Sequence, residues 1–373
     1  MVLRVKTVDR NDFQPLVAQL KEIILAEIRS GKYAPGERIP SERELCKIYG
    51  VSRTTARNAL IDLANAGHVT RAVGSGTYVA DASQGASDFA NGTIGFLLCR
   101  HHYPVRRLRE DYFYFEVMEG IQEELSISGR HFLFHQLDDE RREESLVRDL
   151  VGKVDGILLA EAQSEQFVRS IQQVDVPLVL INPSIDRLRL DLHTVSIDNR
   201  AGAYKGVRHL VELGHQAIGC IRGPQDSTPA EERYEGYLRA LGEAGVAIRE
   251  DWVELSEDWT IEAGTSATQR LIRRVPGLTA IFGTSDTLAV GVLNALSSSR
   301  RVPEEVSVVG FDDISIAAHA NPPLTTVRSP ILQLGKTSCR LLNSISSTKD
   351  LPTTTILFSP ELVVRASTKR HLL

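Results

Sequence analysis

The spacing of apolar residues near the start of the chain predicts an amphipathic helix. These residues recur at intervals of three and four: Leu16, Leu20, Ile23, Ile24 and Ile28. Ser30 and Gly31 follow the stripe and are typical of a helix end, since glycine tolerates the left-handed backbone of a C-cap. We therefore expect a first helix over about residues 15–30.

Ser41 and Glu44 predict the start of a second helix. Their spacing is that of a capping box, in which each side chain bonds to the other residue's backbone N–H. The helix is expected to end near Tyr49-Gly50 and to turn Leu45 and Ile48 toward the core.

A third helix is expected from Ser52, which can cap its first turn, to about residue 66. One face is apolar and consists of Ala56, Ala59, Leu60 and Leu63. Another face is polar and consists of Arg53, Thr54, Arg57 and Asn58. Two helices joined by a glycine turn indicate a helix-turn-helix, and two short strands over 67–71 and 74–79 would add the hairpin of a winged helix.

From Thr93 onward the pattern changes to short apolar runs separated by helical stretches. The runs predict buried parallel strands over 94–98, 131–134, 156–159, 178–181, 217–221, 252–255, 280–283 and 306–310. Segments such as 117–128 and 143–151 predict the helices between them. This rhythm indicates two doubly wound α/β lobes, which hold small ligands at the carboxyl ends of their strands.

Charge differs between the two parts of the chain. The formal net charge is −5, which taken alone argues against a nucleic-acid partner. Residues 1–80, however, contain 12 Lys and Arg against 8 Asp and Glu, while the remainder has 31 against 40. A basic head on an acidic body suggests two functions, although an excess this small can also arise by chance.

Composition excludes several classes of protein. With 373 residues, 42% hydrophobic and 24% charged, the chain has the balance of a globular protein with two or three cores. No run approaches 18 apolar residues, and the first twenty residues already contain Asp9 and Asp12, so we expect neither a membrane span nor a secretion signal. The four cysteines lie far apart and are expected to be reduced, mostly buried thiols of a cytoplasmic protein.

The polar face of the third helix has the chemistry that reads DNA. Arginine binds guanine O6 and N7 together, asparagine pairs with adenine, and a helix N-terminus favours phosphate. A single pair such as Arg53 and Arg57 can equally be a solvated helix face. The helix pair, the cap and the hairpin occur in order around it, and together they favour DNA binding.

Residues 14–79 resemble the winged-helix domain of GntR-type bacterial regulators. The matching segments are Gly36 to Leu45, Val51 to Arg57, and the hairpin Gly74 to Thr77. The resemblance implies that Arg43, Arg53 and Arg57 contact operator DNA and that Thr54 and Thr55 help at phosphates. Asn58, on the same polar face, is expected to contact the DNA as well. It also implies that the hairpin tip, with Gly74, Ser75 and Gly76, enters the minor groove.

Residues 93–370 resemble the effector domain of LacI-type repressors and periplasmic sugar-binding proteins. The matching segments include 195–202, 209–215, 233–236, 285–289, 308–313 and 322–327. The implied fold is α/β, an N-terminal winged helix-turn-helix plus a two-lobed, doubly wound, periplasmic-binding-protein-like domain. The expected domains are 1–80, a linker 81–92, and 93–373, with a first lobe mainly over 93–195 and 324–348 and a second mainly over 196–323 and 353–368.

The same resemblance implies a ligand pocket between the lobes. The residues carried over are Phe113, Tyr114, Asn182, Arg233, Trp259, Ser285 and Asp312. Arg233 is expected to bind vicinal hydroxyls and Asp312 to accept from hydroxyls, while the aromatic rings offer apolar surfaces. Ser285 departs from the asparagine common at its position. Each residue also has a structural interpretation, since such charges often form loop ion pairs and such rings often belong to the core.

Other candidate chemistry is weaker. Cys99, His101 and His102 lack a second ligand cluster, so we expect no metal and no cofactor. Gly335-Lys336-Thr337 imitates the end of a phosphate loop, but Pro330 stands where that loop requires glycine. The basic loop 101–109 is expected to be exposed and solvated; the alternative is that it favours an acidic or phosphorylated ligand.

We therefore expect a transcriptional regulator rather than an enzyme. Its expected partners are double-stranded operator DNA, a sugar-like effector and a second copy of the chain in a homodimer, with no membrane. The expected mechanism is a population shift, in which the effector closes the lobes and changes operator affinity. The alternative is a cytoplasmic sugar-binding or sugar-metabolising protein without a regulatory role.

Overall fold

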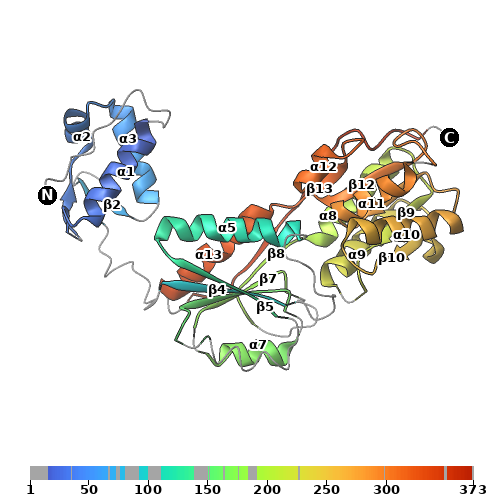
Figure 1. The fold of residues 1–373 in the computed structure, drawn as a ribbon, viewed down its shortest axis with the longest axis horizontal. Coiled ribbons are helices and arrows are strands. Elements are labelled where there is room, and N and C mark those ends of the chain that lie inside the picture. The colour runs from blue at the N-terminus through green and yellow to red at the C-terminus, as the bar shows by residue number, and fades with distance from the viewer. Residues whose placement is uncertain are drawn as a thin grey trace. The chain divides into compact units, whose positions relative to one another are not determined.

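The chain forms two compact units, residues 1–89 and 90–373, which we call the head and the body. The computed structural model describes residues 16–34, 36–65, 68–72, 76–79, 92–99, 111–137, 150, 152–162, 164–174, 176–183, 191–225, 227–297, 299–347 and 351–371 (Figure 1). The expected linker 81–92 apart from Gly92, the loop 101–109 and most of the expected helix 143–151 lie outside these residues.

The head has the expected helices and hairpin. Its elements are α1 (Leu16–Arg29), β1 (Arg38–Ile39), α2 (Glu42–Tyr49), α3 (Arg53–Asn65), β2 (Val69–Ala72) and β3 (Gly76–Val79). The three strands form an antiparallel sheet in the order β1-β3-β2. Strand β1 is an addition to the predicted hairpin, because a run of two residues is too short to give a strand pattern.

The predicted caps fix the ends of α2. The Ser41 side chain accepts from the backbone N–H of Glu44, the Ser41 N–H donates to the Glu44 carboxylate at 2.8 Å, and Gly50 adopts a left-handed φ of 65°. Leu45 is buried as expected, but the prediction for Ile48 is wrong, since it is 57% exposed. Tyr49, four residues after Leu45, packs against the core instead.

The first lobe of the body is built on a six-stranded parallel sheet in the order β14-β8-β7-β6-β4-β5. Its strands are β4 (Thr93–Cys99), β5 (His131–Leu137), β6 (Gly156–Ala160), β7 (Leu178–Ile181), β8 (Thr194–Ile197) and β14 (Thr355–Phe358). Helices α5 (Tyr112–Ser128) and α13 (Ile331–Ser347) cover one face, and α7 (Glu165–Gln172) covers the other (Figure 1).

Two glycines bring α5 and α13 into close contact. A Cβ atom at Gly120 or at Gly335 would lie 2.2 Å from a backbone oxygen of the opposite helix. Gly335, the glycine of the apparent phosphate-loop ending, therefore serves helix packing.

The second lobe has a six-stranded sheet in the order β10-β9-β11-β12-β13-β15, parallel except for β15. Its strands are β9 (Ile218–Arg222), β10 (Val253–Leu255), β11 (Ala280–Gly283), β12 (Ser307–Asp312), β13 (Thr325–Arg328) and β15 (Glu361–Val363). Its helices are α8 (Asn199–Glu212), α9 (Thr228–Glu243), α10 (Ile261–Arg274), α11 (Asp286–Leu296) and α12 (Ser315–His319), with a 3-10 turn over Glu250–Trp252.

The chain crosses between the lobes after β8, after β13 and after β14. Two expected lobe boundaries need correction. Strand β13 lies within the segment 324–348 assigned to the first lobe, but it pairs with β12 of the second; β14 lies within 353–368, but it pairs with β8 of the first. Such short edge strands do not indicate their partners, because backbone hydrogen bonds between distant segments decide the pairing.

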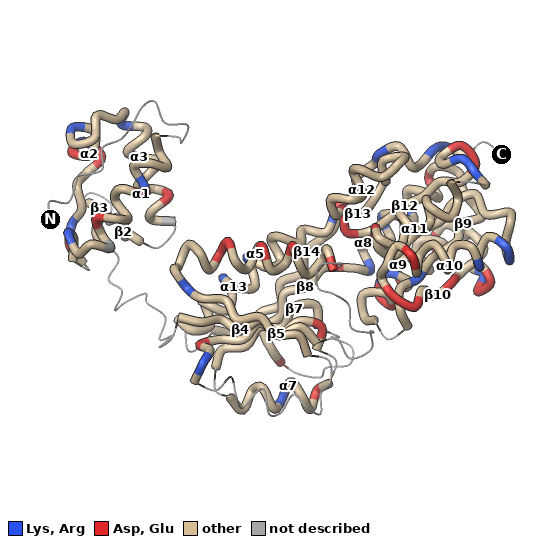
Figure 2. The backbone as a smooth tube through the Cα atoms, viewed as in Figure 1, with Lys and Arg blue, Asp and Glu red and all other residues tan. Residues whose placement is uncertain are grey.

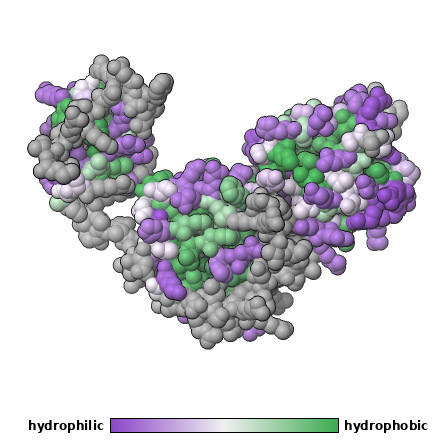
Figure 3. Space-filling model, in the orientation of Figure 1, coloured by the Kyte–Doolittle hydropathy of each residue, from purple (hydrophilic) through white to green (hydrophobic). Residues whose placement is uncertain are grey.

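The described surface shows both charged and apolar areas. In Figure 3 hydrophilic residues spread over much of the visible face of the second lobe, and an apolar area lies on the first lobe. The edge strand β5 exposes alternate residues, including Leu133 at 38%. Within the described part of the chain, no helix is both long and apolar enough to cross a membrane.

Candidate ligand pocket and nucleic-acid interface

A cavity in the body has residues of both lobes in its wall and about 630 Å³ of empty volume, part of it open to solvent. All seven residues expected at a ligand site line it: Phe113, Tyr114, Asn182, Arg233, Trp259, Ser285 and Asp312.

Strand ends deliver the polar side chains to this cavity. Asn182 directly follows β7, Asp312 ends β12, and Ser285 caps α11 two residues after β11. The carboxyl ends of parallel strands meet at one edge of a sheet, which explains why residues far apart in the chain converge here.

The backbone around the cavity is strained. In the described part of the chain the non-glycine residues with positive φ are Glu161 at 55°, Asn182 at 46°, Asp312 at 107° and Asp313 at 57°. Three of them line the cavity. Side chains disfavour these conformations, and strain of this kind tends to gather at functional sites.

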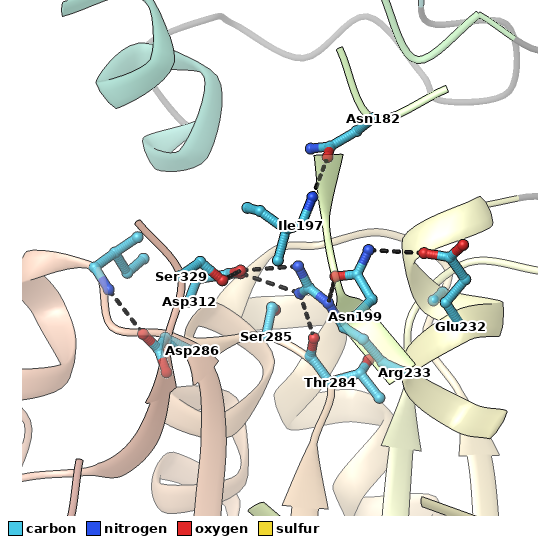
Figure 4. Close-up of polar contacts among 12 residues, drawn as sticks. Asn182, Ile197, Asn199, Glu232, Arg233, Thr284, Ser285, Asp286, Asp312 and Ser329 are labelled. Carbon is cyan, nitrogen blue, oxygen red and sulfur yellow. Dashed lines mark hydrogen bonds and ion pairs between the residues drawn. The ribbon is translucent and has the colours of Figure 1, made fainter. Parts of the chain in front are cut away.

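Arg233 and Asp312 form a buried ion pair in the wall of the cavity (Figure 4). Arg233 Nη1 and Nη2 donate to the two Asp312 carboxylate oxygens at 3.1 and 2.8 Å, and Nη1 also donates to the Thr284 carbonyl oxygen at 2.7 Å. Arg233 Nε donates to Asn199 Oδ1 at 2.9 Å. The guanidinium fork expected to meet ligand hydroxyls is thus directed at Asp312, and one N–H of Nη2 has no protein partner within the described residues.

A second buried carboxyl group, that of Asp286, lies near this pair. Asp286 is fully buried; Ile314 N donates to its Oδ2 at 2.9 Å, and the Thr326 hydroxyl lies 2.5 Å from its Oδ1. Burial raises the pKa of Asp286 well above its usual value, and the nearby charge of Asp312 raises it further. Burial also raises the pKa of Asp312, but Arg233 opposes that rise. The two carboxyl groups therefore differ in their surroundings, since a cation opposes the rise in pKa at Asp312, whereas burial and the Asp312 charge both raise the pKa of Asp286.

Aromatic rings form the apolar part of the wall. Phe113 and Tyr114 meet edge to face with their centroids 5.1 Å apart. Trp259 lies so close to Gly223 that a Cβ atom there would be 2.3 Å from the indole ring. The Arg233 guanidinium lies over Phe311, with its Cζ 3.9 Å from the ring centroid, and over Trp259 at 5.9 Å.

Sequence reasoning missed part of the wall. The missed residues are Asp111, Tyr112, Glu161, Pro229, Asp286, Thr287 and Ile314. Glu161 could have been found, since it follows β6 directly, and Asp286 and Thr287 follow Ser285. The remaining four carry no comparable signal, because apolar and capping residues occur at many helix starts.

The head presents the predicted DNA-reading side chains on its surface. Arg43 on α2 is exposed, as are Arg53, Thr54, Arg57 and Asn58 on α3, and Figure 2 shows basic residues on both helices. Thr55 is only partly exposed; its N–H donates to Ser52 Oγ at 3.0 Å and its hydroxyl lies 2.8 Å from the same oxygen. It therefore helps to cap α3.

At the hairpin, Gly76 has a φ of 138°, and a Cβ atom there would lie 2.8 Å from Arg38 Nε, so the position favours glycine. Gly74 and Ser75 lie outside the described residues. Among the described residues no group of three or more His, Cys, Asp or Glu side chains could hold a metal, and His101 and His102 lie outside them. Cys99, Cys220 and Cys339 are buried, and Cys46 is partly buried.

A head with exposed arginines on a helix-turn-helix and a two-lobed body with a polar pocket define a class, the transcription regulators that join a DNA-binding domain to a ligand-binding domain. Residues 16–79 match the gntR family of bacterial regulatory proteins, and residues 207–368 match the periplasmic binding protein-like domain. The chain is 32% identical over 264 residues to the HTH-type transcriptional repressor CytR of Escherichia coli (strain K12), covering 69% of this chain and 76% of that protein. The chain therefore belongs to the regulators with a GntR-type head and a LacI-type, periplasmic-binding-protein-like effector domain.

Two further similarities extend over most of the chain. The arabinose metabolism transcriptional repressor of Geobacillus stearothermophilus is 28% identical over 371 residues, which cover 95% of this chain and 98% of the repressor. The structure of a complex of the transcriptional regulator CelR with cellobiose aligns with a TM-score of 0.67 and 27% identity over 88% of this chain and 100% of that one. These relatives are transcription regulators and not enzymes, which removes the sugar-metabolising alternative.

Proposed function

We propose that this protein is a repressor whose affinity for operator DNA is controlled by a sugar or sugar derivative bound between the lobes of the body. The observation that supports the ligand class most directly is the wall of the cavity, which combines the Arg233–Asp312 pair with Asn182, Ser285 and Trp259. Sugars offer hydroxyl groups to such donors and acceptors and an apolar face to such a ring. Relatives named for arabinose metabolism and solved with cellobiose support the same class.

On the DNA side, we infer that Arg43, Arg53, Arg57 and Asn58 contact the operator, with Thr54 and Thr55 near phosphates. The hairpin residues Gly74, Ser75 and Gly76 would enter the minor groove. A homodimer with two heads would bind a two-fold symmetric operator in the cytoplasm, where the chromosome is accessible. The exposed arginines of the head and the family membership support this inference.

Calorimetry of the full chain against pentoses, hexoses, cellobiose, uronates and sugar phosphates tests the ligand class. We expect saturable heat with at least one of these sugars, and loss of that heat in Trp259→Ala. Trp252→Ala is the matched control, because it removes the same side chain from the 3-10 turn outside the cavity. Flat traces with every sugar would contradict the proposal.

Whether the ligand weakens or strengthens operator binding is measured with operator DNA that is selected from a random duplex library. A ligand that relieves repression should weaken binding to the selected duplex in a gel-shift or anisotropy assay. Tighter binding in the presence of the sugar would show that it acts as a co-repressor instead.

A further inference from the structure

The pocket is connected to the places where the chain passes from one lobe to the other. Asn199 is the first residue of α8 and follows the crossing that leaves β8 of the first lobe. Ser329 lies in the crossing between β13 of the second lobe and α13 of the first. Any rotation of the lobes must change the backbone at these crossings, because they are covalent links between the two sheets.

Both residues bond to the ion pair in the cavity wall (Figure 4). Arg233 Nε donates to Asn199 Oδ1 at 2.9 Å, and the Ser329 N–H donates to the Asp312 carbonyl oxygen at 3.2 Å, with the Ser329 hydroxyl 3.4 Å from Asp312 Oδ1. The four residues are buried: Arg233, Asn199 and Ser329 are each 4% exposed, and Asp312 is 7% exposed.

The orientation of the Asn199 amide is fixed by charge on both sides. Its oxygen faces the Arg233 guanidinium, and its Nδ2 donates to Glu232 Oε2 at 2.9 Å. A flipped amide would point its N–H groups at the guanidinium and its oxygen at the carboxylate, so the flipped state is disfavoured. Asn199 is consequently a stiff link between the ion pair and the start of α8.

Helix α8 reaches the third crossing as well. Lys205 on α8 donates through Nζ to the Pro360 carbonyl oxygen at 2.7 Å and to the Ser359 hydroxyl at 3.1 Å, between β14 and β15. A Cβ atom at Gly202 would lie 2.9 Å from Pro360 Cγ, so α8 packs directly on this crossing. A shift of α8 would therefore act on two crossings together.

We propose that Asn199 and Ser329 are positioning residues that couple the state of the Arg233–Asp312 pair to the angle between the lobes. A ligand whose hydroxyls compete for the guanidinium and the carboxylate shifts the pair, and the two links carry that shift into the crossings. Packed interiors respond to such shifts by changing between discrete arrangements. The ligand part of this proposal rests on the proposed function, whereas the coupling within the protein does not.

The test measures the distance between the lobes by pulsed electron paramagnetic resonance of the full chain. Nitroxide labels are placed at Gln173→Cys beside α7 and Gln269→Cys on α10, both exposed, in a Cys46→Ser background. Without any sugar, we expect Asn199→Ala to shift or broaden the distance distribution relative to the parent. Thr268→Ala, which removes a buried hydroxyl that bonds to Gly264 within the same lobe, is the control and should leave the distribution unchanged.

Ser329→Ala is the milder second variant, because it removes only one hydroxyl, and it should produce a smaller shift in the same measurement. Circular dichroism establishes that each variant is folded. Distributions identical to the parent in folded Asn199→Ala and Ser329→Ala proteins would overturn the coupling. If none of the sugars tested by calorimetry binds the parent, the proposed ligand class fails. The distances between the labels, which are measured without sugar, still decide the coupling.

Discussion

At the scale of single residues, two buried carboxyl groups of the body differ in their partners, since only one of them bonds to the Arg233 guanidinium. Arg233 pairs with Asp312 through two hydrogen bonds, while Asp286, without a cation, has a raised pKa because of its burial and the nearby Asp312. A buried charge is tolerated only when it is paired, and an unpaired carboxyl group in such a place takes up a proton. The two aspartates should therefore respond differently to the same substitution.

We expect Asp312→Asn to lower the free energy of unfolding by about 3 kcal/mol, because it leaves the Arg233 charge uncompensated in the interior. Asp286→Asn should instead raise it at neutral pH, because the raised pKa of the buried carboxyl group costs stability there and an amide has no such cost. Urea unfolding followed by circular dichroism measures both. Equal losses in the two variants would contradict the assignment of the charge.

The sign of the pH effect follows from the raised pKa of Asp286. The folded state holds the proton to a higher pH than the unfolded state, so this residue's contribution to stability falls as pH rises from about 4 toward the folded pKa. Asp286→Asn should lack this decline, and urea midpoints measured across that range compare the two proteins.

At the scale of elements, the packing of the head fixes the position of α3. The capping box of α2, the left-handed Gly50 and the buried face of α3 fix the helix pair, so that Arg53 and Arg57 project one turn apart from the exposed side. Both side chains are exposed, so a DNA groove is accessible to them. The elements of the head thus determine which side chains face a DNA duplex.

We expect Arg53→Ala and Arg57→Ala each to weaken binding to the selected operator by about 1–3 kcal/mol at fixed salt and to relax its sequence preference. Lys32→Ala is the control, because this lysine pairs with Glu27 of α1 and its removal changes the net charge by the same amount. Fluorescence anisotropy over a series of salt concentrations separates the two effects. Losses no greater than that of Lys32→Ala would contradict the DNA-reading role.

At the scale of the whole molecule, the head and the body have separate cores. One core cluster lies in the head around Leu20 and Leu60, and three clusters of buried residues in the described part of the body contain no residue of the head. The charge divides in the same way, since the head is basic and the body acidic. The net charge of −5 is therefore a poor guide to the partners of either unit.

We expect calorimetric unfolding of the full chain to show two transitions, and a bound sugar should raise only the transition of the body. A sugar at one hundred times its dissociation constant stabilises the folded state by about 2.7 kcal/mol. Operator DNA should raise the other transition. A sugar that shifts both transitions equally would show that the two units unfold as one.

The sequence by itself determined the three helices and the hairpin of the head, eight strands of the body and seven of the residues around the cavity, because these follow from local periodicity, caps and strand ends. Helix α2 shows the limit of that reasoning, since Tyr49 rather than Ile48 packs inward. Only the tertiary structure decided which sheets β13 and β14 join, and that Arg233 pairs with Asp312 and holds Asn199. Those contacts join residues 79 and 34 positions apart, where no local pattern of residues specifies the partner.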